Sequence, residues 1–83
     1  MMAMKTPRTD DEIERLGEEL IERKVKPKLL AEDDGKFIAV DVDTGEYEID
    51  RDDFTAIMKL RKRNPKAELW LGRAGFPTAY VIR

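Results

Sequence analysis

Residues 36–49 of the chain read KFIAVDVDTGEYEI, and this stretch decides the fold. Residues 36–42 are apolar on both faces of a strand, which is typical of a strand that other elements cover on both sides. The Asp-Thr-Gly at 43–45 supplies turn chemistry, and residues 46–49 alternate between polar and apolar types as a half-exposed strand does. The sequence therefore predicts a β-hairpin here.

One helix is predicted before this hairpin. Thr9 and Glu12 have the spacing of a capping box, in which each side chain binds a free backbone N–H of the first turn. Pro27 ends the helical pattern, and we expect Leu29 and Leu30 to form one more turn that docks on the core. The apolar stripe of this helix, at helical spacing, consists of Ile13, Leu16, Leu20 and Ile21.

A second helix is predicted after the hairpin. Asp50 is its expected N-terminal cap, and Asn64 and Pro65 end it. Lysine and arginine fill its last turn, where the helix dipole favours cations. Its expected buried stripe consists of Phe54, Ile57, Met58 and Leu60.

The predicted order of elements is α-β-β-α-β-β. The last two strands, residues 67–71 and 78–82, are joined by a glycine-containing loop at 72–77. We expect one small α+β domain over residues 9–83, with an antiparallel-rich sheet and both helices packed on one face of it. Residues 1–8 are predicted to be a disordered N-terminus.

The 83 residues include no cysteine and no histidine. The chain therefore has no disulfide, no thiolate nucleophile and no Cys/His zinc site, and it lacks the commonest general base. No apolar run reaches the roughly 18–20 residues of a membrane span, and the first residues have no signal-peptide core. We expect a non-catalytic, cytoplasmic protein that needs no cofactor or metal and makes no membrane contact.

Charge is divided into opposed blocks along the chain. Residues 32–53 carry ten acidic and two basic groups, whereas residues 54–83 carry seven basic groups and one acidic group. Such blocks can attract each other within one molecule or between copies, and the sequence leaves both open. The interpretation that the sequence favours is solvated charge on separate faces. One basic run could contact the phosphates of a nucleic acid: Lys59, Arg61, Lys62, Arg63 and Lys66. The net charge of −2 instead favours helix capping and solubility as its role.

Two short motifs invite a catalytic or ligand-binding interpretation. Residues 43–45 match the Asp-Thr-Gly of aspartic proteases, but that chemistry needs two such loops sharing one proton, and Glu46 adds a repelling charge. Hydrolysis by carboxylates around Asp43 stays a third hypothesis. A calcium loop that starts at Asp41 has its glycine at the wrong position. The Gly-Arg-Ala-Gly at 72–75 lacks the ending and the following helix of a phosphate loop.

The last predicted strand pair is the most useful hint of function. Leu69, Trp70 and Leu71 are apolar on both faces of a strand, so a helix of this chain, a second copy or another protein must cover each face. Aromatic and arginine side chains dominate the energetics of protein interfaces, and a loop-borne arginine suits a carboxylate partner. The predicted interface anchors are Trp70, Arg73, Phe76 and Tyr80.

Four stretches carry a resemblance to known proteins: GKFIAVDVDTG at 35–45, YEI at 47–49, RNPKA at 63–67, and GRAG at 72–75 with Ala79 and Tyr80. Over about residues 10–83 the chain resembles a family of short, largely uncharacterised bacterial proteins that are frequent in cyanobacteria. Such proteins are often encoded beside toxin-like or small protease-like genes, so the resemblance implies an antitoxin-like or accessory role. It implies no catalytic or ligand residue. The element order differs from the swapped-hairpin and ribbon-helix-helix folds of DNA-binding antitoxins, which argues against operator binding.

From these observations we expect a protein-interaction module that is homo-oligomeric and antitoxin-like or accessory in role. Its expected partner is a second copy of the chain, another small protein, or both. Nucleic-acid binding through the basic run is the alternative function.

Overall fold

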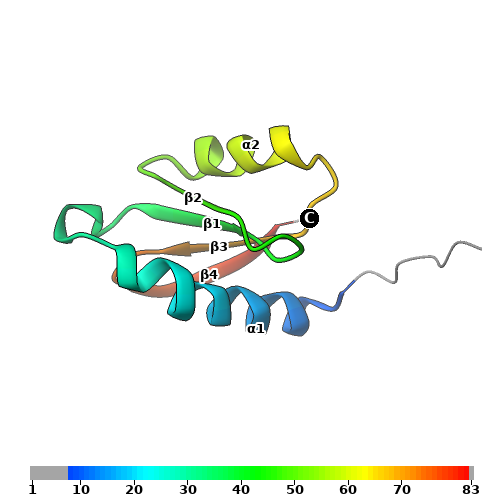
Figure 1. Ribbon diagram of the computed structural model, residues 1–83, viewed down its shortest axis with the longest axis horizontal. Helices are drawn as coiled ribbons and strands as arrows, with labels where there is room; N and C mark the ends of the chain where they lie inside the picture. The colour runs from blue at the N-terminus through cyan, green and yellow to red at the C-terminus, as the bar shows by residue number, and fades with distance from the viewer. Residues whose placement is uncertain (1–7, 83) are drawn as a thin grey trace, which may run out of the picture.

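The computed structural model describes residues 8–82 of the chain (Figure 1). Short π and 3₁₀ turns at Ile21–Val25, Lys26–Lys28 and Ala31–Asp33 connect the first helix to the sheet. The α+β class, with two helices and a four-stranded antiparallel sheet, is confirmed. The helices and strands are α1 (Asp10–Leu20), β1 (Phe37–Asp41), β2 (Tyr47–Asp50), α2 (Asp53–Arg63), β3 (Leu69–Arg73) and β4 (Phe76–Ile82).

The sheet has the strand order β2-β1-β3-β4, and every neighbouring pair is antiparallel. The predicted hairpin is formed by β1 and β2. Strand β1 lies inside the sheet, where Ile38 pairs with Ile49 of β2 on one side and with Gly72 of β3 on the other. This interior place accounts for the apolar run of β1 from Phe37 to Val40, because residues 38–41 are buried and Phe37 is half-buried.

The two helices pack on opposite faces of the sheet, α1 on one side and α2 on the other (Figure 1). The prediction that both helices share one face is therefore wrong. Successive side chains of a strand point to opposite faces, and β1 is apolar on both. Its Ile38 and Val40 belong to the core under α1, whereas Ala39 packs with Ala56 and Leu60 of α2. One helix on each face removes both sets of side chains from water.

Each helix covers only part of its face. Helix α2 packs mainly over β1 and β2, whereas α1 packs mainly across β3 and β4. On the face of α2, the end of the sheet beside the β3–β4 turn has no helix above it. Phe76 and Tyr80 of β4 are 48% and 59% exposed as a result.

Trp70 sets the distance between α1 and the sheet. Its side chain is 6% exposed and lies between two glycines, Gly17 of α1 and Gly72 of its own strand. A Cβ on Gly17 would lie 2.3 Å from Cγ of Trp70, and a Cβ on Gly72 would lie 2.6 Å from Cζ3 of the same ring. Any side chain at either position would overlap the indole, so the close approach of α1 requires glycine at both.

Both helix starts are capped by side chains. The capping box of Thr9 and Glu12 is confirmed, since Glu12 N donates to Thr9 Oγ1 (3.2 Å) and Thr9 N donates to Glu12 Oε1 (2.9 Å). For α2 the expected cap was two residues too early. Asp52 is the cap, and its Oδ2 accepts from Thr55 N at 3.0 Å. Asp50 is the last residue of β2 and accepts from Asp52 N instead.

The buried stripe of α2 differs from the expected one. Ala56 and Leu60 are buried and Ile57 packs partly against them, whereas Phe54 and Met58 are 65% and 42% exposed. The helix meets the sheet through small Ala56, which leaves the two larger side chains on its outer flank.

Two connections also differ from the expected ones. The predicted loop at 72–77 is a turn at Ala74 and Gly75 only, since β3 runs to Arg73 and β4 starts at Phe76. Gly75 has φ of +82°, a conformation that favours glycine. Leu29 packs on the core, but Leu30 is 61% exposed.

The expected disordered terminus at residues 1–8 is mostly outside the described part of the chain. Residues 1–7 and the C-terminal Arg83 are not described. Arg8 is described, and it is held by ion pairs with Asp43 and Glu68. The ordered part therefore begins at least one residue earlier than expected.

Gly17→Ala tests the close contact of α1 with Trp70. In an ordinary helix interior this change would stabilise by up to about 1 kcal/mol. Here overpacking should outweigh that gain and lower the free energy of unfolding by about 1–3 kcal/mol. Urea unfolding followed by circular dichroism measures it, with Glu18→Ala on the exposed side as the control. Equal or higher stability of Gly17→Ala would contradict this packing.

Candidate interaction surface

Arg73, at the end of β3, is held between two aromatic rings. It pairs across the sheet with Phe37 of β1 on one side and with Phe76 of β4 on the other. Its guanidinium carbon lies 5.0 Å from the centroid of the Phe37 ring and 4.4 Å from that of Phe76. Arg73 Nε also donates to the carbonyl oxygen of Gly35 at 2.8 Å. Cation–π attraction and this hydrogen bond fix the guanidinium before any partner arrives.

Tyr80 extends this aromatic cluster along β4. It pairs with Leu71 of β3, two residues from Arg73, so its side chain lies on the same face of the sheet. A shallow depression of about 310 Å³ lies among these side chains, with Asp53 at the start of α2 also lining it. We call the exposed side of this cluster the aromatic–arginine surface, and it consists of Phe37, Arg73, Phe76 and Tyr80.

The charge of Arg73 is not compensated locally. Within residues 8–82, no carboxylate forms an ion pair with it. The guanidinium therefore combines a fixed position with unused hydrogen-bonding capacity beside apolar rings. A carboxylate next to an apolar group is the chemistry that matches such a site.

Trp70 does not belong to this surface, although the sequence predicted it as an anchor with the other three residues. It lies one position from Leu71 and so points to the opposite face, where α1 buries it. Its indole N–H is buried and has no hydrogen-bond partner among the described residues. Phe37 takes its place in the surface. The sequence places Phe37 at the start of an interior strand. Its contact with Arg73 could not be predicted from the sequence, because it requires β1 and β3 to be neighbours in the sheet.

Two members of the basic run predicted for nucleic acid are paired with acidic side chains of the same molecule. Lys59 pairs with Asp50 of β2 at 3.2 Å. Arg63 pairs with Glu46 at 2.7 Å and also with Glu48, and the hydrogen bond that Arg63 donates to Glu46 is the first cause that raises the pKa of Arg63.

The remaining members of the run are Arg61, Lys62 and Lys66, and they differ in exposure. Arg61 is half-buried, and its Nε and one Nη are buried without a hydrogen-bond partner in the described part of the chain. Lys62 and Lys66 are exposed. The ion pairs of Lys59 and Arg63 with Asp50, Glu46 and Glu48 show that the acidic and basic blocks of the sequence meet within one molecule.

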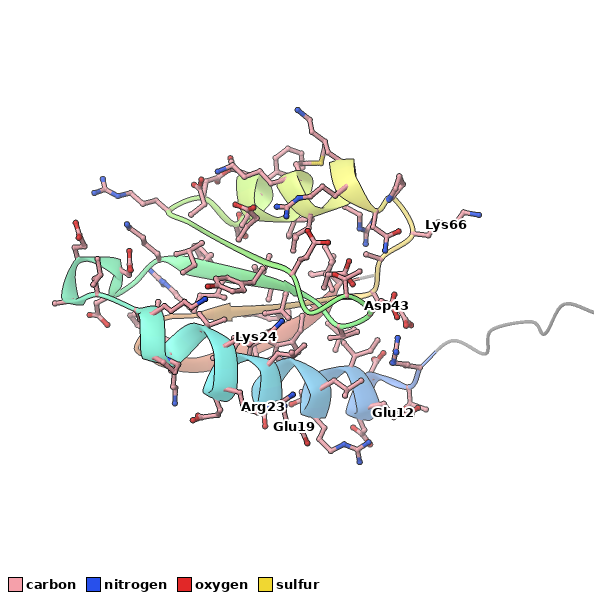
Figure 2. The ribbon with its side chains drawn as sticks, viewed as in Figure 1. Glu12, Glu19, Arg23, Lys24, Asp43 and Lys66 are labelled. Carbon is pink, nitrogen blue, oxygen red and sulfur yellow. The ribbon has the colours of Figure 1, made fainter. Side chains whose placement is uncertain are left out.

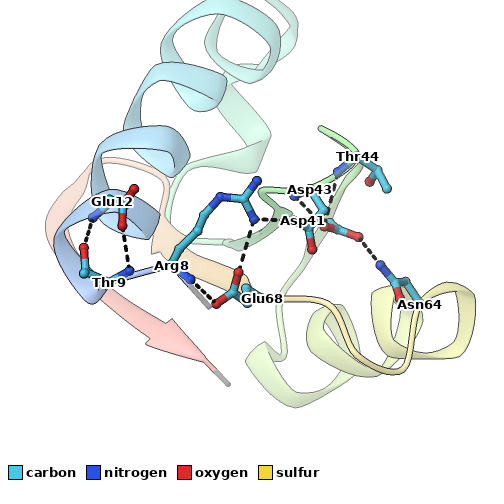
Figure 3. A network of polar contacts seen from close by, with 8 residues as sticks. All are labelled: Arg8, Thr9, Glu12, Asp41, Asp43, Thr44, Asn64 and Glu68. Atoms are coloured by element: carbon cyan, nitrogen blue, oxygen red, sulfur yellow. Dashed lines mark hydrogen bonds and ion pairs between the residues drawn. The ribbon is translucent and has the colours of Figure 1, made fainter. Parts of the chain in front are cut away.

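The Asp-Thr-Gly turn after β1 is organised by a buried carboxylate (Figure 3). Asp41 is 1% exposed, and its Oδ1 accepts from the backbone N–H of Asp43 (2.9 Å) and of Thr44 (3.3 Å). Its other oxygen accepts from the side-chain amide of Asn64 at 3.4 Å. Asp41 thus joins the turn to the end of α2.

The carboxylate of Asp43 is paired with a cation in this turn. It binds the guanidinium of Arg8, and that hydrogen bond is the first cause that raises the pKa of Arg8. Arg8 also pairs with Glu68 at 3.2 Å. Among residues 8–82, no group of three or more acidic side chains converges in a way that could hold a metal ion. Asp43 therefore has a structural role, joining the turn to Arg8, and hydrolysis by paired carboxylates around it stays a prediction.

No protein-family model, no curated protein and no solved structure matches the chain. The resemblance to short bacterial proteins therefore stays a prediction. Neither of the described helices combines the length and the apolar character needed to cross a bilayer.

Stability measurements separate the core role of Trp70 from the surface role of Tyr80. Trp70→Ala should lower the free energy of unfolding by about 3–5 kcal/mol, because it empties the space between α1 and β3. Tyr80→Ser removes a side chain that is 59% exposed and should change it by less than about 1 kcal/mol. Urea unfolding of both variants measures the difference. If the two variants lose the same stability, the assignment of these residues to core and surface is wrong.

Proposed function

We propose that the chain is a non-catalytic protein-interaction module that binds a partner protein through the aromatic–arginine surface. The observation that carries this proposal is the state of Arg73. It is held by two rings and a carbonyl oxygen, and none of the described carboxylates pairs with it. An arginine fixed in this way loses little side-chain freedom on binding, so more of the contact energy is left for affinity.

The chemistry of the surface selects the kind of partner. A carboxylate can form two parallel hydrogen bonds with a guanidinium, and the flanking rings of Phe76 and Phe37 exclude water from such a pair. Tyr80 offers an apolar ring with a hydroxyl at its tip, a side chain that is enriched in binding surfaces. The partner segment should therefore present an acidic residue next to an apolar one.

A binding role is also the one that the residue content favours. Histidine and cysteine are absent from the sequence, and the carboxylates of the Asp-Thr-Gly turn are used in local hydrogen bonds and in the pair with Arg8. We further propose an antitoxin-like or accessory role, the one implied by the resemblance to short bacterial proteins. Nucleic-acid binding is less favoured, because Lys59 and Arg63 are engaged by acidic side chains of the same molecule.

Affinity capture with matched arginine variants tests the proposal. The full chain is immobilised and exposed to nuclease-treated lysate of its source organism, and bound proteins are identified by mass spectrometry. Arg73→Gln should reduce the bound partner at least about tenfold. Arg73→Lys should give an intermediate loss, since it keeps the charge without the planar donor pair. Arg15→Gln, the same charge change on α1, should bind like the unaltered chain.

Two outcomes would contradict the proposal. One is a partner that Arg73→Gln retains as well as the unaltered chain does. The other is the capture of no protein from nuclease-treated lysate together with the recovery of nucleic acid from untreated lysate, which would move the function to the basic run.

A further inference from the structure

The two edges of the sheet differ in how they are protected. Strand β2 forms one edge with four residues, and its Glu48 and Asp50 are charged and bound to cations of α2. Strand β4 forms the other edge and has seven residues, Phe76 to Ile82, none of them charged. Charged residues and short length are the usual means by which a sheet edge avoids pairing with another strand. Proline and register irregularities also protect an edge, and β4 has Pro77 near its start and a register shift opposite Gly72 and Arg73. Residues 79–82 of β4 have no charge, no proline and no register shift, so this part of the edge is open to an additional strand.

The register of the sheet defines which backbone groups lie on the open edge of β4. Val42 N donates to Glu68 O and Ala74 N donates to Lys36 O, at the two ends of β3. The backbone N–H and C=O groups of the even-numbered residues along β3 therefore point toward β1. Backbone groups alternate sides along a strand, and odd-numbered residues of β3 therefore face β4. Leu71 and Leu69 pair with Tyr80 and Ile82. The N–H and C=O groups of Ala79 and Val81 consequently point away from the sheet.

We propose that the occupant of this edge is β4 of a second copy, paired antiparallel about a two-fold axis at Tyr80. Ala79 of each copy then pairs with Val81 of the other, and the four outward N–H and C=O groups of each strand are used in four hydrogen bonds. The two Tyr80 residues face each other as a non-hydrogen-bonded pair, with Cα atoms about 4.5 Å apart. A register one residue away would place Pro77, which has no N–H, opposite Val81 and would lose hydrogen bonds.

Charge along α1 supports a second copy in this antiparallel arrangement. Helix α1 runs antiparallel to β4. Its N-terminal end is near Glu68, since Arg8 N donates to that side chain, and its other end lines a groove with Ala74 and Phe76 at the β3–β4 turn. Residues 10–22 carry seven acids and one base, whereas residues 23–28, in the π and 3₁₀ turns that continue α1, carry four bases and no acid. Two of these bases are engaged within the molecule, since Lys24 Nζ donates to Gly45 O at 3.4 Å and Lys26 pairs with Glu22.

The two α1 helices run antiparallel to each other across the two-fold axis. Opposite charges of the two helices therefore have the same position along the direction of the strands. The acidic first turn of one α1 then lies opposite Arg23 and Lys28 of the other copy, the two bases of this segment that are not engaged by Gly45 or Glu22. Figure 2 shows this division on one chain, with Glu12 and Glu19 preceding Arg23 and Lys24 along the helix. These exposed charges are screened by salt, so high ionic strength should weaken the dimer.

This assembly goes beyond the proposed partner binding. It places the Tyr80 residues of the two copies side by side at the axis, and it leaves Phe37, Arg73 and Phe76 accessible. Arg73 and Phe76 lie at the β3–β4 turn, at the far ends of the paired strands from the two-fold axis. A dimer would therefore present two aromatic–arginine surfaces on one face of a continuous sheet. The paired strands bury a small area, which is typical of weak and reversible association.

A cysteine placed at the two-fold axis tests the geometry in purified protein. The chain has no cysteine of its own. Tyr80→Cys places two thiols across a non-hydrogen-bonded pair, at a Cα separation that suits a disulfide. Under mild oxidation it should form a covalent dimer at least about tenfold faster than Phe76→Cys. Phe76 is an exposed residue of the same strand, but it lies opposite no residue of the second β4.

A second pair of variants tests the unlinked dimer by sedimentation equilibrium over a series of protein concentrations. Tyr80→Lys sets two ammonium groups opposite each other and should weaken dimerisation at least about tenfold, whereas Tyr80→Thr should weaken it less. Equal disulfide rates at positions 76 and 80, or a chain that stays monomeric at about 1 mM, would overturn the proposal. These measurements use the pure chain, so their failure would leave the capture of a partner by Arg73 unaffected.

Discussion

The packing of Trp70 between Gly17 and Gly72 is the constraint from which the rest of the arrangement follows. The indole fills the space under α1, and it fits only because both neighbours lack a Cβ. This contact places α1 over β3 and β4. The opposite face of β1 then needs its own cover, which α2 provides through Ala56 and Leu60. With one helix on each face and neither spanning the full width, the β3–β4 end under α2 is left exposed.

Local features of the fold could be read from the sequence because short-range physics determines them. The hairpin of β1 and β2 follows from a strand-period pattern and from turn residues, and the capping box of Thr9 and Glu12 follows from a spacing of three residues. The cap of α2 was misplaced because three aspartates, at 50, 52 and 53, satisfy the same local rule. Only tertiary contacts show that Asp50 ends a strand.

Long-range features were harder to predict, although some signals were present. The apolar character of β1 on both faces already argued for cover on two sides, but the choice between one helix per face and a second chain depends on packing. Trp70 and Arg73 lie on opposite faces, and an uncertain strand boundary was enough to assign them to the same surface. Gly17 in the middle of a helix was the overlooked signal, since an interior helix glycine usually marks a close approach.

The charged side chains of the surface differ in whether a carboxylate of the same molecule pairs with them. The acidic side chains of β2 neutralise two cations of α2, and Arg8 joins the Asp-Thr-Gly turn to Glu68. Arg73 differs from these cations, because aromatic rings hold it in place of carboxylates. The unprotected edge of β4 lies beside it. Two binding features therefore share one end of one sheet, the arginine on its face and the open strand at its edge.

Fluorescence of Trp70, the only tryptophan in the chain, tests most directly the claim that this residue organises the interior. The emission is recorded with increasing iodide, over the range of protein concentrations in which the chain associates. If α1 covers the ring as described, emission is blue-shifted, iodide quenches it poorly, and association leaves it unchanged. Red-shifted emission that iodide quenches in the dilute protein, and that association protects, would show Trp70 at an interface and contradict the account.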